Sequence, residues 1–223
     1  MSSETESAYP EGDRMSDAGR APAPHRAKPA LINPVWVRLT HWGTALAVIL
    51  MVLSGWRIYD ASPVFANFTI PPGWTLGGWL GGALQWHFAA MWLLFASFVS
   101  YLLLNLFSGR LFRKFFPLSP KAVLSDLFKA LTGKLGHDDL SHFNAVQKLA
   151  YLSAILALIV IILSGLAIWK SVQFSVLRDL MGGYDNARVV HFCAMAFLVL
   201  FFVVHVVMVA LVPRSLLTML RGR

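Results

Sequence analysis

The chain is poor in charge and in cysteine. Asp, Glu, Lys and Arg make up 13% of its 223 residues, against 57% hydrophobic residues. Soluble domains carry about twice that share of charge, so the composition excludes an ordinary soluble protein. Cys193 is the single cysteine, which excludes an intramolecular disulfide. The first thirty residues contain no apolar run, so we expect no cleaved signal peptide and a first membrane span that directs insertion.

Long apolar runs fill the gaps between the charges. Four stretches contain no ionised residue, namely 39–56, 61–109, 149–169 and 189–212. Each contains an apolar run of about 18 to 25 residues, enough for a helix to cross a hydrocarbon core of ~30 Å. We therefore predict an all-α integral membrane four-helix bundle. Its spans are expected at about residues 35–58, 83–107, 145–169 and 188–212.

This transmembrane domain is predicted to cover residues 34–215. Residues 1–33, rich in Ser, Glu, Ala and Pro, are expected to form a disordered cytoplasmic tail, and residues 216–223 a second cytoplasmic tail. A short amphipathic helix is expected around "KAVLSDLFKAL", between the second and third spans.

The net charge of +8 could indicate a nucleic-acid partner, but the basic residues are sorted by side of the membrane. If the N-terminus is cytoplasmic, fifteen of the 19 Lys and Arg residues fall on cytoplasmic segments. The outer side keeps four: Arg57, Lys170, Arg178 and Arg188. This is the positive-inside distribution. Both termini are therefore predicted to be cytoplasmic, and lipid rather than nucleic acid is the expected partner of the basic segments.

Four of the seven histidines lie within the predicted spans: His41, His87, His191 and His205. With this topology His87 and His191 lie near the outer face, and His41 and His205 near the inner face. The two histidines of the last span are fourteen residues apart. This spacing corresponds to a rise of about 21 Å and a rotation that returns to within about 40° of the same helix face. The sequence therefore predicts two depth-matched pairs, His87 with His191 and His41 with His205.

Paired imidazoles inside a membrane indicate a bound group. An intramembrane ionisable residue is costly unless it is satisfied, and it usually marks function. One histidine alone could hydrogen-bond a neighbouring helix, but two depth-matched pairs are harder to explain that way. Zinc requires three or four ligands together, and the spans offer no Asp or Glu. Haem fits better, because it takes axial ligands from opposite sides and its apolar ring suits a bundle interior.

No Cys-x-x-Cys-His motif is present for covalent attachment. We therefore predict two haems b, bound non-covalently through the iron. Arg57 or Arg188 outside and Arg38 inside are candidate partners for their propionates, and each arginine could instead serve only as an anchor at the flank of its helix.

The first and third spans share a weak internal repeat. "VILMVLSGWRIY" resembles "LIVIILSGLAIW" and places Gly55 and Gly165 at similar depths. Two interpretations stay open: the glycines allow two helices to approach closely, or they make room for a flat cofactor. The third span has no histidine to match His41.

Three segments carry a resemblance to a known family: "VWVRLTHWGTALAVILMVLSG", "HFNAVQKLAYLSAILALIVIILSG" and "ARVVHFCAMAFLVLFFVVHVVMV". Over residues 33 to 215 the chain resembles the bacterial four-helix di-haem cytochromes b. These include the b561-type proteins and the cytochrome b subunits of formate dehydrogenase and nickel–iron hydrogenase. The resemblance implies that His41, His87, His191 and His205 are haem ligands. It also implies a multi-pass location in the bacterial inner membrane and an electron-transfer role within an oxidoreductase.

The resemblance also implies a quinone and a protein partner. "FNAVQK" is similar to the family's Asn-x-x-Gln-Lys entry to the third helix, beside the inner haem and a quinone, which implies quinone contacts for Asn144 and Gln147. Asn144 could instead cap that helix, and the outer face near Trp74, Trp86 and Tyr184 is an alternative quinone site. Sequences of this subgroup resemble membrane partners of periplasmic molybdopterin-dependent oxidoreductases.

Two other classes of function stay open. A free-standing superoxide:quinone oxidoreductase, similar to the short b561-type proteins, would need a basic outer funnel, for which Lys170, Arg178 and Arg188 are available. A haem-free anchor or transporter is disfavoured by the depth-matched histidines. The direction of electron flow is not encoded in any of these patterns.

Overall fold

A computed structural model describes residues 32–132 and 144–222, and all regular elements in these ranges are helices. In chain order these elements are α1 Val35–Ala61, the short 3-10 helix η1 Pro72–Trp74, α2 Leu80–Phe107, α3 Arg110–Phe115, α4 Pro120–Leu131, α5 Ala145–Trp169, α6 Ser175–Leu180, α7 Tyr184–Leu211 and α8 Pro213–Arg221. The predicted N-terminal tail, apart from Ile32 and Asn33, lies outside the described residues.

The four long helices α1, α2, α5 and α7 are each long and apolar enough to cross a membrane. This confirms the predicted all-α membrane fold. A helix is the expected form for such a segment, because it satisfies its own backbone hydrogen bonds where no water is present. Pro213 ends α7 because proline cannot continue the hydrogen-bond ladder, and the same residue begins α8.

Two helices begin earlier in the sequence than predicted. α2 begins at Leu80 rather than at residue 83, and α7 begins at Tyr184 rather than at residue 188. The first turn of α7 contains Asp185, which suits the positive end of a helix. The difference arises because a helix continues past the hydrocarbon into the polar interface, whereas the predicted starts followed the apolar run alone.

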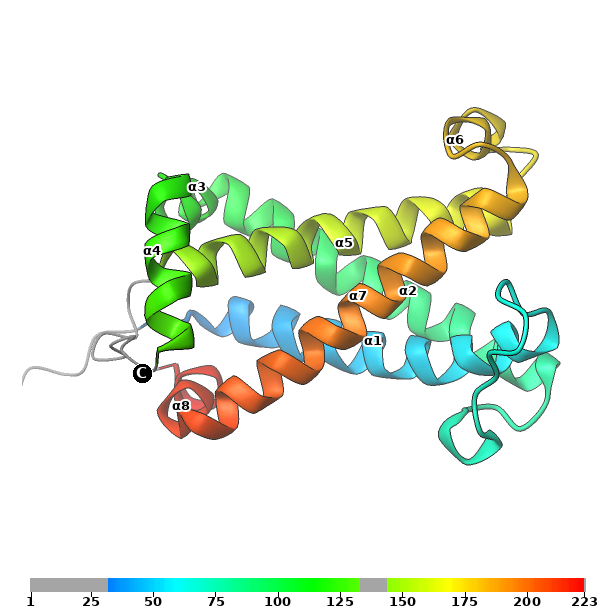
Figure 1. The fold of residues 1–223 in the computed structure, drawn as a ribbon, viewed down its shortest axis with the longest axis horizontal. Coiled ribbons are helices and arrows are strands. Elements are labelled where there is room, and N and C mark those ends of the chain that lie inside the picture. Colours follow the sequence, from blue (N-terminus) through cyan, green and yellow to red (C-terminus); the bar gives the residue numbers. More distant parts are fainter. Residues whose placement is uncertain (1–31, 133–143, 223) are drawn as a thin grey trace, which may run out of the picture. The chain divides into compact units, whose positions relative to one another are not determined.

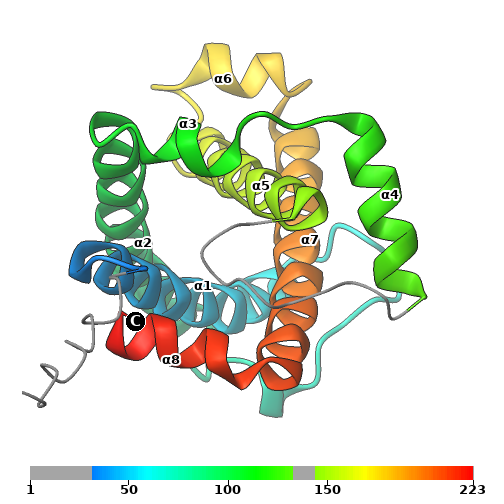
Figure 2. The ribbon, with the colours of Figure 1, turned by 90° about the vertical axis from the view of Figure 1, so that its left-hand side faces the viewer.

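The long helices pack in two pairs. Among the described elements, close backbone packing between long helices is confined to α1 with α2 and α5 with α7 (Figures 1 and 2). Gly43 permits the first approach: a Cβ there would lie 2.4 Å from Ser97 Oγ of α2. The two pairs meet through a buried apolar cluster to which all four long helices contribute. It consists of Ala47, Leu94, Phe98, Ala157, Leu158 and Leu198.

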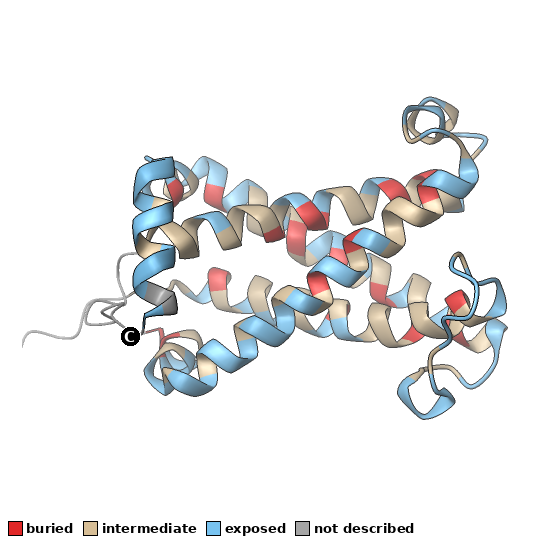
Figure 3. Cartoon of the chain, in the orientation of Figure 1, coloured by how far each residue is buried: buried red, intermediate tan, exposed pale blue. Residues whose placement is uncertain are grey.

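The outward faces of these helices are apolar and exposed (Figure 3). Trp92 is 59% exposed, Leu156 61% and Leu200 63%. In a soluble protein an apolar surface of this extent would be a liability. In a bilayer it is the surface that contacts lipid, so the chain is a multi-pass membrane protein.

The short elements gather at the two ends of the bundle (Figure 1). We call the end with residues 62–79 and α6 the outer end, and the end with α3, α4 and α8 the inner end, following the predicted topology. The amphipathic helix expected around "KAVLSDLFKAL" is α4.

Polar contacts tie the start of α1 to α3 and α8 at the inner end. Arg110 Nη2 donates to Ile32 O and Asn33 Oδ1, both at 3.0 Å. Asn33 Nδ2 reaches Thr218 Oγ1 at 3.4 Å, and Ile32 N donates to Gly222 O at 2.8 Å. Partial burial lowers the pKa of Arg110 from its ordinary value. These contacts fix the position of the first turn of α1, just ahead of His41.

Candidate functional site

The four intramembrane histidines come together two by two. His87 of α2 faces His191 of α7 near the outer end, with ring centroids 6.5 Å apart and ring planes 61° apart. His41 of α1 faces His205 of α7 near the inner end, at 6.2 Å and 59°. Within the described residues, no three His, Cys, Asp or Glu side chains gather as a zinc site would require. The structure therefore places these residues in the two pairs that depth alone indicates, and we call them the outer pair and the inner pair.

Both separations fit an iron atom held between two imidazoles. An imidazole nitrogen binds a transition metal at about 2 Å, so two rings on opposite sides of one metal have centroids roughly 6 to 6.5 Å apart. Rings that hydrogen-bonded or stacked directly would lie closer together. The fit holds at both ends of the bundle, where the ligands come from different helices.

Two serines hold the rings of the outer pair. Ser54 Oγ of α1 lies 3.1 Å from His87 Nδ1, and Ser164 Oγ of α5 lies 3.0 Å from His191 Nδ1. Both serines have no exposed surface. In each helix pair, one helix therefore supplies a histidine and its neighbour supplies the hydroxyl that contacts it.

The glycine after each serine makes room for the same ring. A Cβ on Gly55 would lie 3.3 Å from His87 Cε1, and one on Gly165 would lie 3.3 Å from His191 Cε1. This is tighter than ordinary van der Waals contact. Of the two interpretations of the shared glycines, the structure supports the close approach of neighbouring helices, with a histidine of the next helix against each glycine. Room for a flat cofactor stays a prediction.

The serines were not among the predicted site residues, although a signal for them exists. The repeated tripeptide Leu-Ser-Gly, ending at Gly55 and Gly165, contains them. The two serines do not by themselves indicate a site, because a serine in a membrane helix ordinarily bonds the carbonyl of its own helix.

The repeat extends to the inner end, where the two halves differ. The first half of the repeat consists of α1 and α2, and the second half of α5 and α7. Each half has an aromatic or imidazole residue thirteen positions before its serine and another fourteen positions after its outer histidine. In the first half these are His41 and Tyr101, and in the second half they are Tyr151 and His205. Tyr101 of α2 and Tyr151 of α5 lie close to each other. The repeat thus places tyrosines where a second inner pair of histidines would stand.

Aromatic rings surround the inner pair. His205 stacks on Phe201 of the same helix, with ring centroids 5.9 Å apart and ring planes 13° apart. The rings of His41 and Trp42 pack edge to face, with centroids 5.4 Å apart. Within residues 32–132 and 144–222, no serine or threonine hydrogen-bonds to either inner imidazole.

Arg38, one turn before His41, has a buried Nε atom without a hydrogen-bond partner in the described residues. An unsatisfied buried polar atom is costly, so this nitrogen fits a site for an anionic group near the start of α1, about one helical turn before His41.

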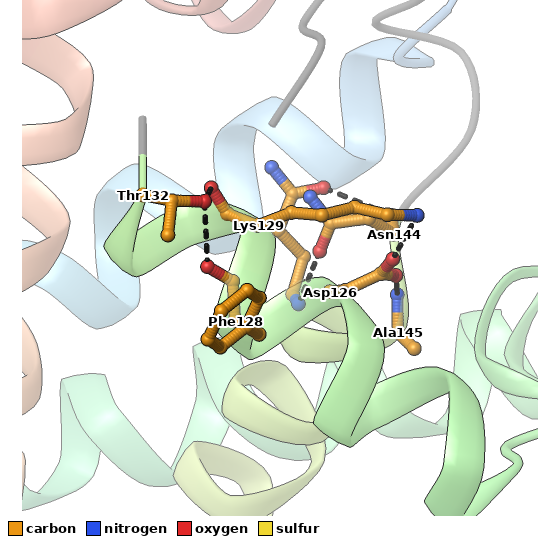
Figure 4. A network of polar contacts seen from close by, with 7 residues as sticks. Asp126, Phe128, Lys129, Thr132, Asn144 and Ala145 are labelled. Atoms are coloured by element: carbon orange, nitrogen blue, oxygen red, sulfur yellow. Dashed lines mark hydrogen bonds and ion pairs between the residues drawn. The ribbon is translucent and has the colours of Figure 1, made fainter. Parts of the chain in front are cut away.

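Asn144 and Gln147 form the N-terminal cap of α5, and Figure 4 shows Asn144 at this cap beside Ala145. Asn144 Oδ1 accepts from Gln147 N at 2.8 Å, and Gln147 Oε1 accepts from Asn144 N at 3.2 Å. Asp126 of α4 adds a bond from Ala145 N at 3.0 Å. This reciprocal pair is a capping box, so the capping role considered for Asn144 is present in the structure. A quinone contact at either residue stays a prediction.

The three outer basic residues of the predicted funnel each have a neighbour. Arg178 pairs with Asp179 at 2.7 Å, and Lys170 lies over the ring of Trp169 at 4.8 Å. Arg188 Nη2 donates to Ser62. Their positive charge is therefore partly neutralised or anchored at the outer end.

The geometry above is that of a membrane bundle able to hold b-type haem between paired imidazoles, and comparison with known proteins gives the class. The family model for prokaryotic cytochrome b561 matches residues 33–222. The chain belongs to this family. It is accordingly a haem-binding, electron-transferring cytochrome b, located as a multi-pass protein in the bacterial inner membrane.

A curated relative narrows the comparison. The chain is 63% identical over 191 residues to the putative protein-methionine-sulfoxide reductase subunit YedZ1 of Azospira oryzae. The match covers 86% of this chain and 96% of that protein. The likeness therefore covers most of both chains, and the name describes that relative as a subunit of a reductase.

Proposed function

We propose that this chain binds two haems b, one between His87 and His191 and one between His41 and His205, and carries electrons across the membrane between them. The observation that supports this most strongly is the pair of imidazole separations, 6.5 and 6.2 Å, at two levels of one bundle. When bound, each haem supplies a one-electron carrier. The residues of the chain supply its axial ligands, its orientation and an apolar interior that excludes water.

Arg38 is proposed to hold a propionate of the inner haem. Its buried Nε has no partner among the described residues, and Arg38 precedes the proposed ligand His41 by one helical turn. A guanidinium and a carboxylate form strong charge-assisted hydrogen bonds.

We further propose that both termini are cytoplasmic and that the partner is a periplasmic, molybdopterin-dependent subunit that reduces methionine sulfoxide. The positive-inside distribution supports this orientation. The relative's name supports the reaction. Reduction of a sulfoxide to a thioether and water consumes two electrons and two protons. In this proposal a quinol bound at the inner end would supply these electrons, and the partner would receive them at the outer end.

The quinone site is proposed at the inner end, at Asn144 and Gln147. Its support is the family resemblance of "FNAVQK" and the position of both residues at the inner start of α5. The outer face near Trp74, Trp86 and Tyr184 is the alternative position.

The superoxide:quinone oxidoreductase alternative gains no specific support. Its basic funnel would require outer cations free to attract an anion, whereas Arg178 and Arg188 have carboxylates of their own at 2.7 and 3.8 Å.

Haem stoichiometry and co-purification test the proposal together. We expect a pyridine haemochrome assay on protein purified from native membrane to give two haems b per chain, with a reductase subunit in equal amount. One haem or none per chain would contradict the di-haem proposal. Two haems without any partner protein, in membrane from cells making sulfoxide reductase, would instead favour a free-standing oxidoreductase.

A further inference from the structure

The hydroxyl groups of Ser54 and Ser164 both point to a backbone carbonyl of their own helix. Ser54 Oγ lies 2.7 Å from Leu50 O, and Ser164 Oγ lies 2.7 Å from Val160 O. A carbonyl oxygen can only accept, so each hydroxyl hydrogen points to its own helix. The lone pairs of each serine oxygen are then left for the imidazole nitrogen on the neighbouring helix.

This orientation determines the tautomer of the outer histidines. An oxygen lone pair facing an unprotonated nitrogen would repel it, so His87 Nδ1 and His191 Nδ1 carry the proton and face the oxygens of Ser54 and Ser164. Each ring also hydrogen-bonds to a backbone carbonyl of the neighbouring helix, His87 to that of Met51 and His191 to that of Ile161, and these acceptors favour the same tautomer. The other ring nitrogen, Nε2, is then unprotonated and available to a metal.

We propose that Ser54 and Ser164 are positioning residues that fix the Nδ1–H tautomer of His87 and His191 and lower the midpoint potential of the outer haem. The inference rests on the proposed ligation of that haem by these two histidines. A hydrogen bond from Nδ1–H to an acceptor makes the other ring nitrogen a stronger electron donor. A stronger donor stabilises ferric iron relative to ferrous iron, which lowers the potential.

The serine and the following glycine act on the same ring. The hydroxyl holds Nδ1, while the missing Cβ of Gly55 or Gly165 lets the Cε1 edge lie against the helix, where a Cβ would stand only 3.3 Å away. The arrangement is present twice, with serine–imidazole distances of 3.1 and 3.0 Å. The same serine–imidazole geometry is therefore present in both halves of the internal repeat.

The test compares alanine variants of both serines in the purified di-haem protein. An equilibrium redox titration followed in the visible spectrum resolves two components, and the one lost in His87→Ala is the outer haem. We expect Ser54→Ala and Ser164→Ala each to raise the midpoint potential of that component, the double variant to raise it further, and the inner component to keep its potential. The electron paramagnetic resonance signal of the ferric outer haem should shift in the same variants.

Ser153→Ala is the matched control. Ser153 lies in α5, and its Oγ donates to Ala150 O at 2.9 Å, as the two outer serines do to their own helices. It contacts no imidazole in the described residues, so both potentials should remain unchanged.

The cysteine variants Ser54→Cys and Ser164→Cys keep the test decisive if an alanine variant fails to assemble. A thiol is a weaker acceptor of similar size, so the outer potential should fall between that of the native protein and that expected for alanine. Unchanged outer potentials in the alanine double variant, or in both cysteine variants, with two haems still present would overturn the serine proposal alone. Retention of both haems in His87→Ala and His191→Ala would instead overturn the ligand assignment on which it rests.

Discussion

The outer and inner pairs of histidines share nearly the same ring separation but differ in what holds the rings. At the outer pair, each imidazole is fixed by a hydroxyl and by a glycine from the neighbouring helix. At the inner pair, aromatic rings contact the imidazoles and a buried arginine nitrogen lies one turn away. The two sites therefore differ in the polar groups near their imidazoles, with buried hydroxyls at the outer pair and a buried arginine nitrogen at the inner pair.

The internal repeat explains why the two ends differ. At the outer end, the repeat brings equivalent histidines from α2 and α7 together, so one symmetric pair is formed. At the inner end, the repeat generates two positions, and Tyr101 and Tyr151 stand at one of them while His41 and His205 stand at the other. The inner end therefore has one pair of imidazoles and one pair of tyrosines.

The largest expected effect is the loss of one whole haem. His87→Ala and His191→Ala should remove the same spectral and redox component, and His41→Ala and His205→Ala the other, because each iron would lose one of its two ligands. Haem content per chain should fall from two to one in all four variants. Loss of one common component in His41→Ala and His191→Ala would break the pairing.

A smaller effect is expected when the space for the outer ring is filled. Gly55→Ala places a Cβ 3.3 Å from His87 Cε1, and overpacking of this kind costs about 1–3 kcal/mol. We expect roughly tenfold faster transfer of the outer haem to an excess of apoprotein acceptor, with the inner haem unaffected.

Gly73→Ala is the control for this prediction, because a Cβ at Gly73 would meet nothing within 4 Å. Equal rates of outer haem loss in Gly55→Ala, Gly73→Ala and the native protein would show that the glycine leaves spare room.

The sequence predicted the spans and the pairing of the four intramembrane histidines for a physical reason. The bilayer fixes the length of an apolar run, and intramembrane imidazoles such as His87 are rare enough to stand out. It did not single out Ser54 or Ser164, because α1 and α5 are apolar on all sides and their pattern does not encode which face turns inward. Whether a serine lone pair meets an imidazole depends on that rotation, and the rotation is set by packing against the neighbouring helix.

At the inner pair, the charge of Arg38 should matter more than its shape. Removing a cation beside a haem favours the ferric state, so Arg38→Ala should lower the midpoint potential of the inner component, on the order of tens of millivolts. Arg38→Lys keeps the charge and should restore most of that potential. A redox titration of both variants decides the point, and an inner potential insensitive to Arg38→Ala would remove the arginine from the site.

The smallest expected effect separates the cap of α5 from the proposed quinone site. Asn144→Ala removes the capping box and should destabilise the start of α5 by about 1 kcal/mol, while both haems stay bound because no ligand is touched.

Slower oxidation of the reduced haems by added quinone in this variant would have two explanations, a lost quinone contact or a displaced helix start. Asn144→Ser distinguishes them, because serine is as good a cap as asparagine but lacks the amide group that could donate to a quinone carbonyl. We expect slow oxidation in both variants and native helix stability only in Asn144→Ser. If Asn144→Ser oxidises as fast as the native protein, Asn144 serves α5 alone, and the search for the quinone moves to the outer face near Trp74, Trp86 and Tyr184.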